Sequence, residues 1–158
     1  MIFRPSHAGP LPSISEIQGT VTECWEGHAR PVPGLRVYVL ATQENSHILA
    51  LLKNIEQAHV QDAEQLKEYL KRCDELVAAL KSLGELSSLT RTDKAGRFGV
   101  IQLKEGKKYV VIAIDWDKGD SEEVFYYRSH VTEALHKGVT HLTVFMGPGD
   151  PKDCKALE

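Results

Sequence analysis

The sequence predicts a mainly β fold, a sandwich of seven strands that is interrupted once by a pair of helices. Short segments with an alternating or continuously apolar pattern recur along the chain, and turn-forming residues separate them. Between these segments lies one long block, residues 44–83, that contains neither glycine nor proline and is rich in Leu, Ala, Glu and Lys. A length of 158 residues suits a single domain that needs no disulfide framework.

The N-terminal part predicts an arm followed by two strands. Prolines stand at positions 5, 10 and 12, so residues 1–13 are expected to form a flexible arm. The segment SEIQGTVTECW, residues 15–25, places Ile17, Gly19 and Val21 on one side and polar residues on the other, as a half-buried strand does. EGHARPVPG is expected to be a loop, and LRVYVLA, residues 35–41, the second strand.

The block that follows has the spacing of an amphipathic helix, and the helical insertion is expected over residues 44–86. Apolar residues recur in steps of three and four and form one stripe. Ser46 is expected to cap the start, and Gly84 to end the helical block. The residues expected to carry the packing, and any contact with a partner, are Ile48, Leu52, Ile55, Leu66, Leu70, Leu76 and Leu80.

Strand patterns return after the insertion and supply the remaining five strands. These are LSSLTRTD, RFGVIQL, YVVIAID, VFYYRSHV and HLTVFMG. YVVIAID is apolar almost throughout, which is typical of a central strand covered on both faces. The turn before RFGVIQL contains Asp93, whose carboxylate can accept hydrogen bonds from backbone NH groups, and Gly96, which tolerates a positive φ. One domain is therefore expected over residues 14–147, with a tail over 148–158.

Four features of these segments together resemble the carboxypeptidase regulatory-like domain. They are Gly19 in the first strand, the Pro31–Gly34 turn, the TDKAGRF stretch over 92–98, and a glycine, Gly106, followed by the apolar strand that ends near Ala113. The resemblance covers most of residues 17–146 outside the helical block. It implies a seven-stranded transthyretin-like Greek-key β-sandwich with an inserted α-helical hairpin, in which the second and third strands are neighbours.

That implied neighbourhood constrains the helical block. One straight helix of this length would span about 60 Å, whereas neighbouring strand ends lie only about 5 Å apart. The block must fold back on itself or pass its return strand to a second molecule, and we favour folding back over a swapped dimer. The break is expected in HVQDAEQL, where Asp62 and Gln65 form a plausible capping pair.

The residues predict no catalytic site and no cofactor. The sequence contains no glycine-rich phosphate loop and no evident Ser/His/Asp arrangement. Hydroxyisourate hydrolase, a transthyretin relative, carries a histidine in its first strand, and this chain has none there. The acidic stretch DWDKGDSEE brings Asp115, Asp117 and Asp120 together, but out of register with an EF-hand loop, so a solvated turn is the simpler interpretation and calcium the alternative.

The prediction is a non-enzymatic structural or protein-interaction module whose contacts, with a protein partner or a second copy, run through the inserted helices. The alternative is a calcium- or carbohydrate-binding accessory domain of a larger exported protein, with Trp25, Trp116, Tyr126 and Tyr127 as candidate sugar contacts.

A net charge of −3 does not favour nucleic acid, and no apolar run is long enough to insert into a membrane. The start of the sequence does not resemble a signal peptide, so the expected location is cytoplasmic for the chain as given and extracytoplasmic for an excised domain. The three cysteines are odd in number and widely spaced, which predicts free thiols.

Overall fold

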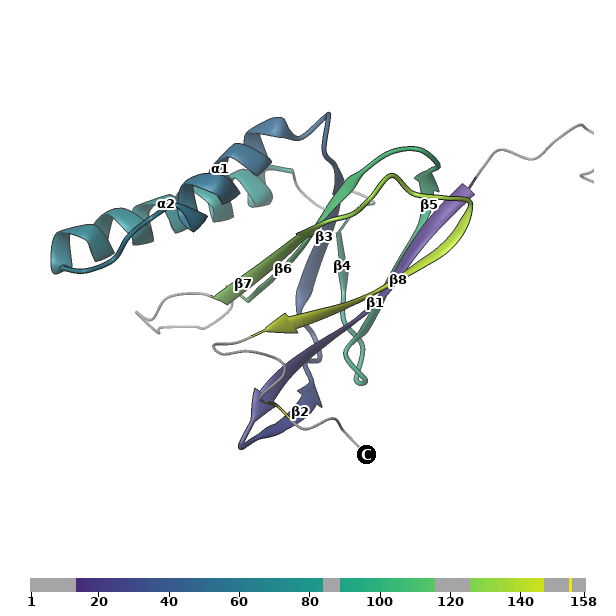
Figure 1. Ribbon diagram of the computed structural model, residues 1–158, viewed down its shortest axis with the longest axis horizontal. Helices are drawn as coiled ribbons and strands as arrows, with labels where there is room; N and C mark the ends of the chain where they lie inside the picture. The colour runs from purple at the N-terminus through teal and green to yellow at the C-terminus, as the bar shows by residue number, and fades with distance from the viewer. Residues whose placement is uncertain (1–13, 84–88, 116–125, 147–153, 155–158) are drawn as a thin grey trace, which may run out of the picture.

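The computed structural model describes residues 14–83, 89–115, 126–146 and 154, and within them the chain forms two four-stranded sheets and a helical hairpin (Figure 1). The strands are β1 (Ile14–Trp25), β2 (His28–Pro31), β3 (Arg36–Ala41), β4 (Leu89–Arg91), β5 (Arg97–Lys104), β6 (Tyr109–Asp115), β7 (Tyr126–Val131) and β8 (Gly138–Met146). The helices are α1 (Ser46–Glu56) and α2 (Ala63–Ser82). This confirms the predicted mainly β sandwich with an inserted helical hairpin.

The first sheet is built around the long strand β1. β8 runs parallel to β1 along one side, in a register that extends from Ser15↔Gly138 to Glu23↔Met146. The other side of β1 is shared by two antiparallel strands, β5 along its first half and β2 along its end. β1 is therefore held on both sides over most of its length.

The second sheet has the strand order β4-β3-β6-β7, with antiparallel neighbours throughout. β3 pairs directly with β4, from Arg36↔Arg91 to Tyr38↔Leu89. Both helices lie between these two strands in the sequence, so the insertion occupies the connection between neighbouring strands, as predicted.

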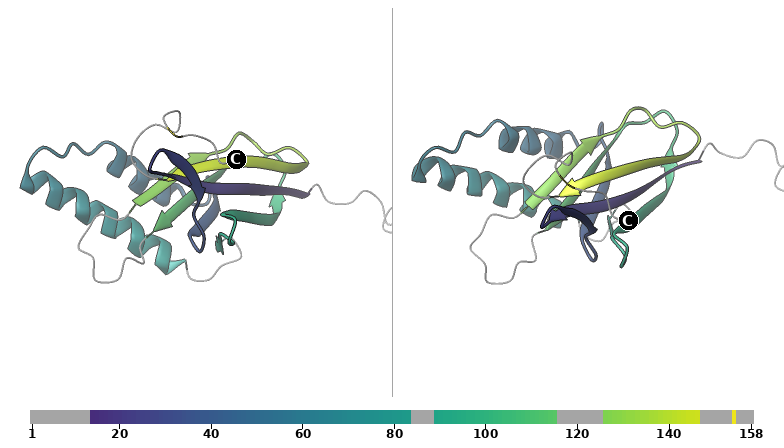
Figure 2. Two further views of the ribbon diagram at one scale, coloured as in Figure 1. Left: turned by 90° about the horizontal axis from the view of Figure 1, so that it is seen from below. Right: turned by 60° about the horizontal axis from the view of Figure 1, so that its bottom comes forward.

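Two apolar cores make the molecule three layers thick. The first core fills the space between the sheets and includes Ile17, Val21 and Phe98. The second lies between the second sheet and the helices and includes Leu40, Ile112 and residues of both helices. β6 contributes alternate side chains to both cores and is buried from Tyr109 to Ile114, which confirms the prediction of a strand covered on both faces. Figure 2 shows the helices and the first sheet on opposite sides of the second sheet.

The two sequence phrases that carry the family resemblance touch each other through Thr92. Its hydroxyl donates to the carbonyl oxygen of Val32 (2.6 Å) and accepts from the backbone NH of Leu35 (2.8 Å). The backbone of Thr92 adds two further bonds, to the NH of Gly34 and the carbonyl of Leu35, both 2.9 Å. Because Thr92 is 5% exposed, these bonds fix the Pro-Val-Pro-Gly turn to the start of the β4–β5 turn in a place water does not reach.

The β4–β5 turn has the predicted chemistry. The carboxylate of Asp93 accepts from the backbone NH groups of Ala95 (2.8 Å) and Arg97 (2.9 Å). Gly96 has a φ of +74°, which glycine adopts without strain. The turn directs Phe98 into the core between the sheets, where it is 5% exposed.

Three sequence expectations differ from the structure. Part of the loop expected after β1 is a strand, so the described residues contain eight strands. Glu26 (φ 50°) and Gly27 (φ 82°) form a two-residue turn with positive φ at both positions, which suits a hairpin between β1 and β2. α1 begins at Ser46 with Asn45 in the cap position, so Ser46 is the first helical residue. Gly84 lies outside the described residues.

The third difference is a disulfide between Cys24 and Cys154, so the prediction of three free thiols is wrong for these two residues. Their Cα atoms are 5.7 Å apart although 130 positions separate them in sequence. The reason is the parallel pairing of β1 and β8, because it places Met146 at the end of β8 beside Glu23, next to Cys24. Cys73 is free and buried. Within the described residues, no helix is long and apolar enough to cross a membrane.

Candidate functional site

The helical hairpin is held on the second sheet by one face of each helix. In α1 the buried side chains are those of Ile48, Leu52 and Ile55, spaced four and three residues apart. In α2 they are Cys73, Leu76 and Leu80, which all lie in its second half. Each spacing keeps the side chains on one helix face, and that face meets the apolar surface of β3 and β6.

The break between the helices lies where the sequence predicts it. Asp62 is the N-cap of α2, and its carboxylate accepts from the backbone NH of Gln65 (2.8 Å). The side chain of Gln65 in turn accepts from the NH of Gln61 (2.7 Å). These two bonds stabilise the first turn of α2 and end the connecting loop.

Five of the seven predicted packing residues are buried in this interface, namely Ile48, Leu52, Ile55, Leu76 and Leu80. The other two, Leu66 and Leu70, lie in the first half of α2, which is the end of the hairpin farther from β3 and β4. Leu66 is 40% exposed and Leu70 half-buried, and Val60 in the connecting loop is 46% exposed. We call Val60, Leu66 and Leu70 the hairpin tip.

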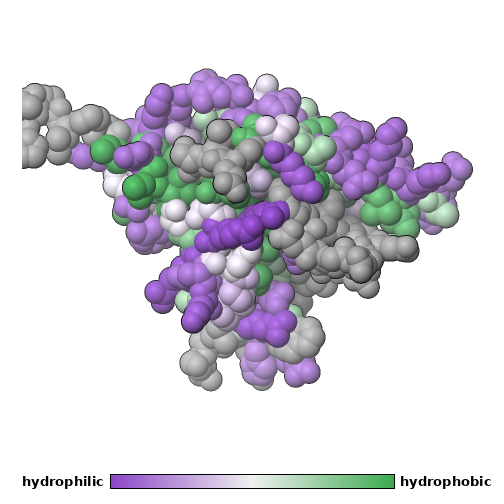
Figure 3. All heavy atoms as spheres, turned by 180° about the vertical axis from the view of Figure 1, so that it is seen from behind, coloured by the Kyte–Doolittle hydropathy of each residue, from purple (hydrophilic) through white to green (hydrophobic). Residues whose placement is uncertain are grey.

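The hairpin tip projects beyond the strands. Figures 1 and 2 show the connecting-loop end of the hairpin extending past the edge of the second sheet. Figure 3 shows hydrophobic side chains at this end with hydrophilic ones around them. Exposed apolar side chains at the end of an otherwise charged helix pair are the part of this element that the fold itself does not use.

Three polar side chains, those of Cys73, Tyr69 and Tyr127, are buried or half-buried where the hairpin packs on the second sheet. Burial raises the pKa of the Cys73 thiol, and the pKa values of Tyr69 and Tyr127 are also raised, chiefly by burial. A thiol in this environment stays protonated at neutral pH, and it is therefore a poor nucleophile. Between the helices, the guanidinium of Arg72 donates to the backbone carbonyl of Asn54 (2.8 Å). These contacts position the helices relative to each other and to the sheet.

The residues proposed for calcium or sugar binding are only partly described. Asp115 ends β6, whereas Asp117 and Asp120 lie outside the described residues. In the described part of the chain, no three His, Cys, Asp or Glu side chains are grouped as metal ligands would be. Of the four aromatic candidates, only the side chain of Tyr127 is described, and it packs against the core under the helices.

A second surface, on the outer face of the first sheet, carries no sequence motif. It is a shallow hollow of about 670 Å³ that crosses β5, β1 and β8. Two cross-strand rows line it: Gly99, Gln18 and His141 in one, Arg97, Thr20 and Thr143 in the other. We call these six residues the sheet hollow. The alternation in β1 predicts that Gln18 and Thr20 face away from the core, but no local pattern predicts that β8 lies beside them in parallel.

Neither a protein-family model nor a curated protein matches the chain. The solved structures similar to it include the following three. The minor pilin GBS52 of Streptococcus agalactiae has a TM-score of 0.46 and 13% identity, over 88% of this chain and 48% of that one. PA1324, a proposed carbohydrate-binding protein from Pseudomonas aeruginosa, has a TM-score of 0.48 and 12% identity, over 90% and 97%. The pilus backbone protein RrgB of Streptococcus pneumoniae has a TM-score of 0.33 and 10% identity, over 82% and 40%. The chain thus spans less than half the length of the two pilus proteins, and at these scores the likeness carries no argument about function.

Proposed function

We propose that the chain is a non-enzymatic interaction module, a transthyretin-like sandwich of the carboxypeptidase regulatory-like type, that contacts a protein through its inserted helices. The observation that carries the proposal is the hairpin tip. Val60 and Leu66 are large apolar residues that remain exposed at the end of the hairpin, whereas Ile48, Leu52, Ile55, Leu76 and Leu80 are buried against the sheet. Exposed apolar side chains grouped at one place are typical of protein contact sites.

The helices have two roles in this proposal, and the residues divide between them. Ile48, Leu76 and Leu80 are fully buried and hold the hairpin on the sheet. Leu66 and Leu70 extend the same stripe past the sheet, where a partner or a second copy would cover them. A contact made there leaves the sandwich unchanged, so binding and folding can be tested separately.

The test is solution mass by light scattering over a range of concentrations, with two variants compared to the parent chain. Leu66→Glu places a charge in the hairpin tip, and Gln65→Glu places the same charge beside it without removing an apolar group. We expect the parent and Gln65→Glu to form a dimer that Leu66→Glu abolishes, with the same melting temperature for all three.

A parent chain that stays monomeric would exclude self-association and leave a different protein as partner. In that case the three proteins are compared for capture of partners from the source organism's extract. Equal capture by Leu66→Glu and Gln65→Glu would contradict a role for the hairpin tip.

A further inference from the structure

We propose that the sheet hollow binds an acidic saccharide, a short sugar chain that carries carboxylates, across β5, β1 and β8. The site lies on the opposite side of the second sheet from the helices, so it is independent of the contact proposed for the hairpin tip. The proposal starts from a glycine that the fold does not require.

Gly99 lies in the middle of β5 on the outer face, where a side chain would ordinarily stand. Its φ is not in the positive range, and a Cβ built on it would meet only the carbonyl oxygen of Ile17, at 3.9 Å. Gly19 is different, because a Cβ there would lie 2.2 Å from the ring of Phe98. A glycine inside a strand weakens the sheet and marks either a bulge or a site where another molecule approaches the backbone. The bulge in β5 lies further along the strand, between Val100 and Leu103, so it does not account for Gly99.

The polar side chains around Gly99 are not engaged with other described residues. Thr20, Thr143 and His141 make no side-chain hydrogen bond to another described residue, and Gln18 bonds only to Glu16 (3.1 Å). The side chain of Arg97 interacts electrostatically with Asp93 but forms no hydrogen bond within the described chain. Hydroxyl, amide, imidazole and guanidinium groups therefore line one hollow with their hydrogen-bonding capacity open to a ligand.

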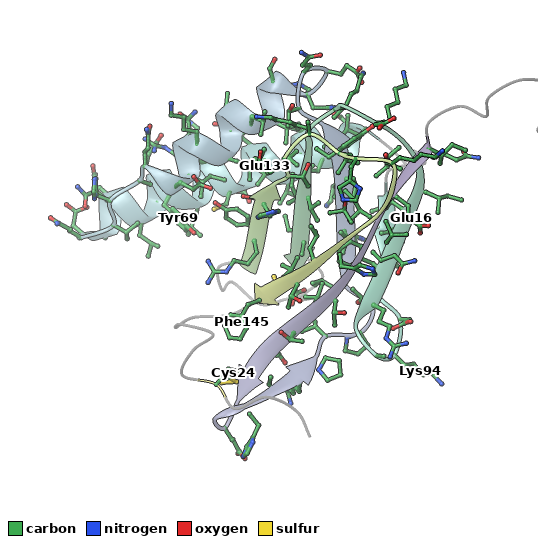
Figure 4. The ribbon with its side chains drawn as sticks, turned by 45° about the vertical axis from the view of Figure 1, so that its right-hand side comes forward. Glu16, Cys24, Tyr69, Lys94, Glu133 and Phe145 are labelled. Atoms are coloured by element: carbon green, nitrogen blue, oxygen red, sulfur yellow. A yellow bond between two sulfur atoms is a disulfide. The ribbon has the colours of Figure 1, made fainter. Side chains whose placement is uncertain are left out.

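This set of groups matches a sugar that carries a carboxylate. Arg97 offers a planar pair of NH donors, which suits a carboxylate. The two threonines and Gln18 can both donate and accept, as the closely spaced hydroxyls of a sugar require. Phe145 is half-buried between the inward-facing Val144 and Met146, so its ring lies on the outer face at the end of β8 (Figure 4). Phe145 is not part of the lining of the hollow, but it lies two residues past Thr143 on the same face of β8 and offers an apolar surface beside the hollow.

Other ligand classes fit the hollow less well. An extended peptide would bind by adding to a free strand edge. Within the described residues, the free edges of this sheet lie on the far sides of β5 and β8, whereas β1, which forms the floor of the hollow, is paired on both sides. A nucleic acid would need several cations, and Arg97 is the one permanently charged residue among the nine that line the hollow. The chain also has a net charge of −3, which does not favour a polyanion.

The first experiment is an amide NMR titration of the full chain with trigalacturonate, and with maltotriose and triglutamate as comparison ligands. We expect trigalacturonate to shift the amide signals of the sheet hollow and to leave those of α1 and α2 unchanged. Absence of any shift at about 10 mM, shifts confined to other regions, or equal binding of maltotriose or triglutamate would overturn the proposal.

Three variants sharpen the test. Gly99→Val fills the hollow and restores a strand-forming residue, so we expect binding to be lost while the melting temperature stays the same or rises. Arg97→Gln is expected to weaken binding about tenfold, the size of one charge-assisted contact. Lys94→Gln removes the same charge from the nearby turn, where Figure 4 shows its side chain pointing away from the sheet, and should leave binding unchanged. Equal losses in Arg97→Gln and Lys94→Gln, or full binding by folded Gly99→Val, would overturn the proposal.

Discussion

Replacement of Thr92 by valine tests the contact that joins the Pro-Val-Pro-Gly turn to the β4–β5 turn. Valine has the same shape but no hydroxyl, so the NH of Leu35 loses its acceptor and the carbonyl of Val32 loses a donor. A buried NH group left without a partner costs about 1–3 kcal/mol, and the second lost hydrogen bond about 0.5–1.5 kcal/mol. We expect a loss of about 2–4 kcal/mol of unfolding free energy, which lowers the melting temperature by about 6–12 °C for a chain of this size.

Thr140 provides the matched control. Its hydroxyl oxygen is buried and has no hydrogen-bond partner among the described residues. The same threonine-to-valine change should therefore leave stability unchanged or raise it by up to about 1 kcal/mol, because a buried polar atom without a partner is removed. Both variants are measured by urea denaturation with a common slope. Equal shifts in Thr92→Val and Thr140→Val, or a change at Thr92 below about 0.5 kcal/mol, would refute the reasoning.

Three further predictions concern the first sheet, a turn and the cysteines. Gly19→Ala should lower the free energy of unfolding by about 1–3 kcal/mol, because its Cβ would overlap the ring of Phe98. Gly99→Ala should not lower it, and a comparison of the urea midpoints of the two variants tests this difference. Backbone hydrogen bonds lower the pKa of Asp93, so the stability advantage of the parent over Asp93→Asn should be present at pH 7 and disappear as the pH falls below about 4; an advantage that persists in acid would contradict this assignment. In a thiol assay without reductant, no cysteine should react in the folded chain and one, Cys73, after unfolding, whereas reactive thiols beyond Cys73 would contradict the disulfide.

The strands and the hairpin could be predicted because their signals are local. The alternation in β1, the continuous apolar run of β6 and the spacing of three and four in the insertion each depend on residues close in sequence. The pair Asp62 and Gln65 was sufficient to place the break between the helices, because a capping interaction is made within one turn.

The remaining features depend on contacts that have no local pattern. The sheet hollow combines three strands, and β8 reaches β1 from more than a hundred positions away in a parallel register that no turn fixes. The disulfide between Cys24 and Cys154 follows from that same register. β2 was missed for another reason, since its turn places Glu26 at a positive φ, which glutamate seldom adopts.

The apolar periodicity of the helical insertion does not predict which residues of the stripe the sheet covers. Periodicity identifies the face of α2 that is apolar, but not how far the sheet beneath it extends. Leu66 and Leu76 belong to the same stripe, yet one is 40% exposed and the other fully buried. The sheet ends between them, and this boundary comes from the length and order of strands elsewhere in the chain.

The disulfide also determines how the chain would carry tension. A pull applied at Ile14 and at the C-terminal side of Cys154 would cross from Cys154 to Cys24 through a covalent bond and then run along β1 alone. The chain between the two cysteines is a closed loop, so neither the sandwich nor the hairpin could be drawn out while the bond is intact. The load would pass through the covalent backbone of β1, which is already extended, so the hydrogen bonds that hold β1 to β8 and β5 would carry little of it. Reduction of the bond would place nearly the whole chain in the path of the force.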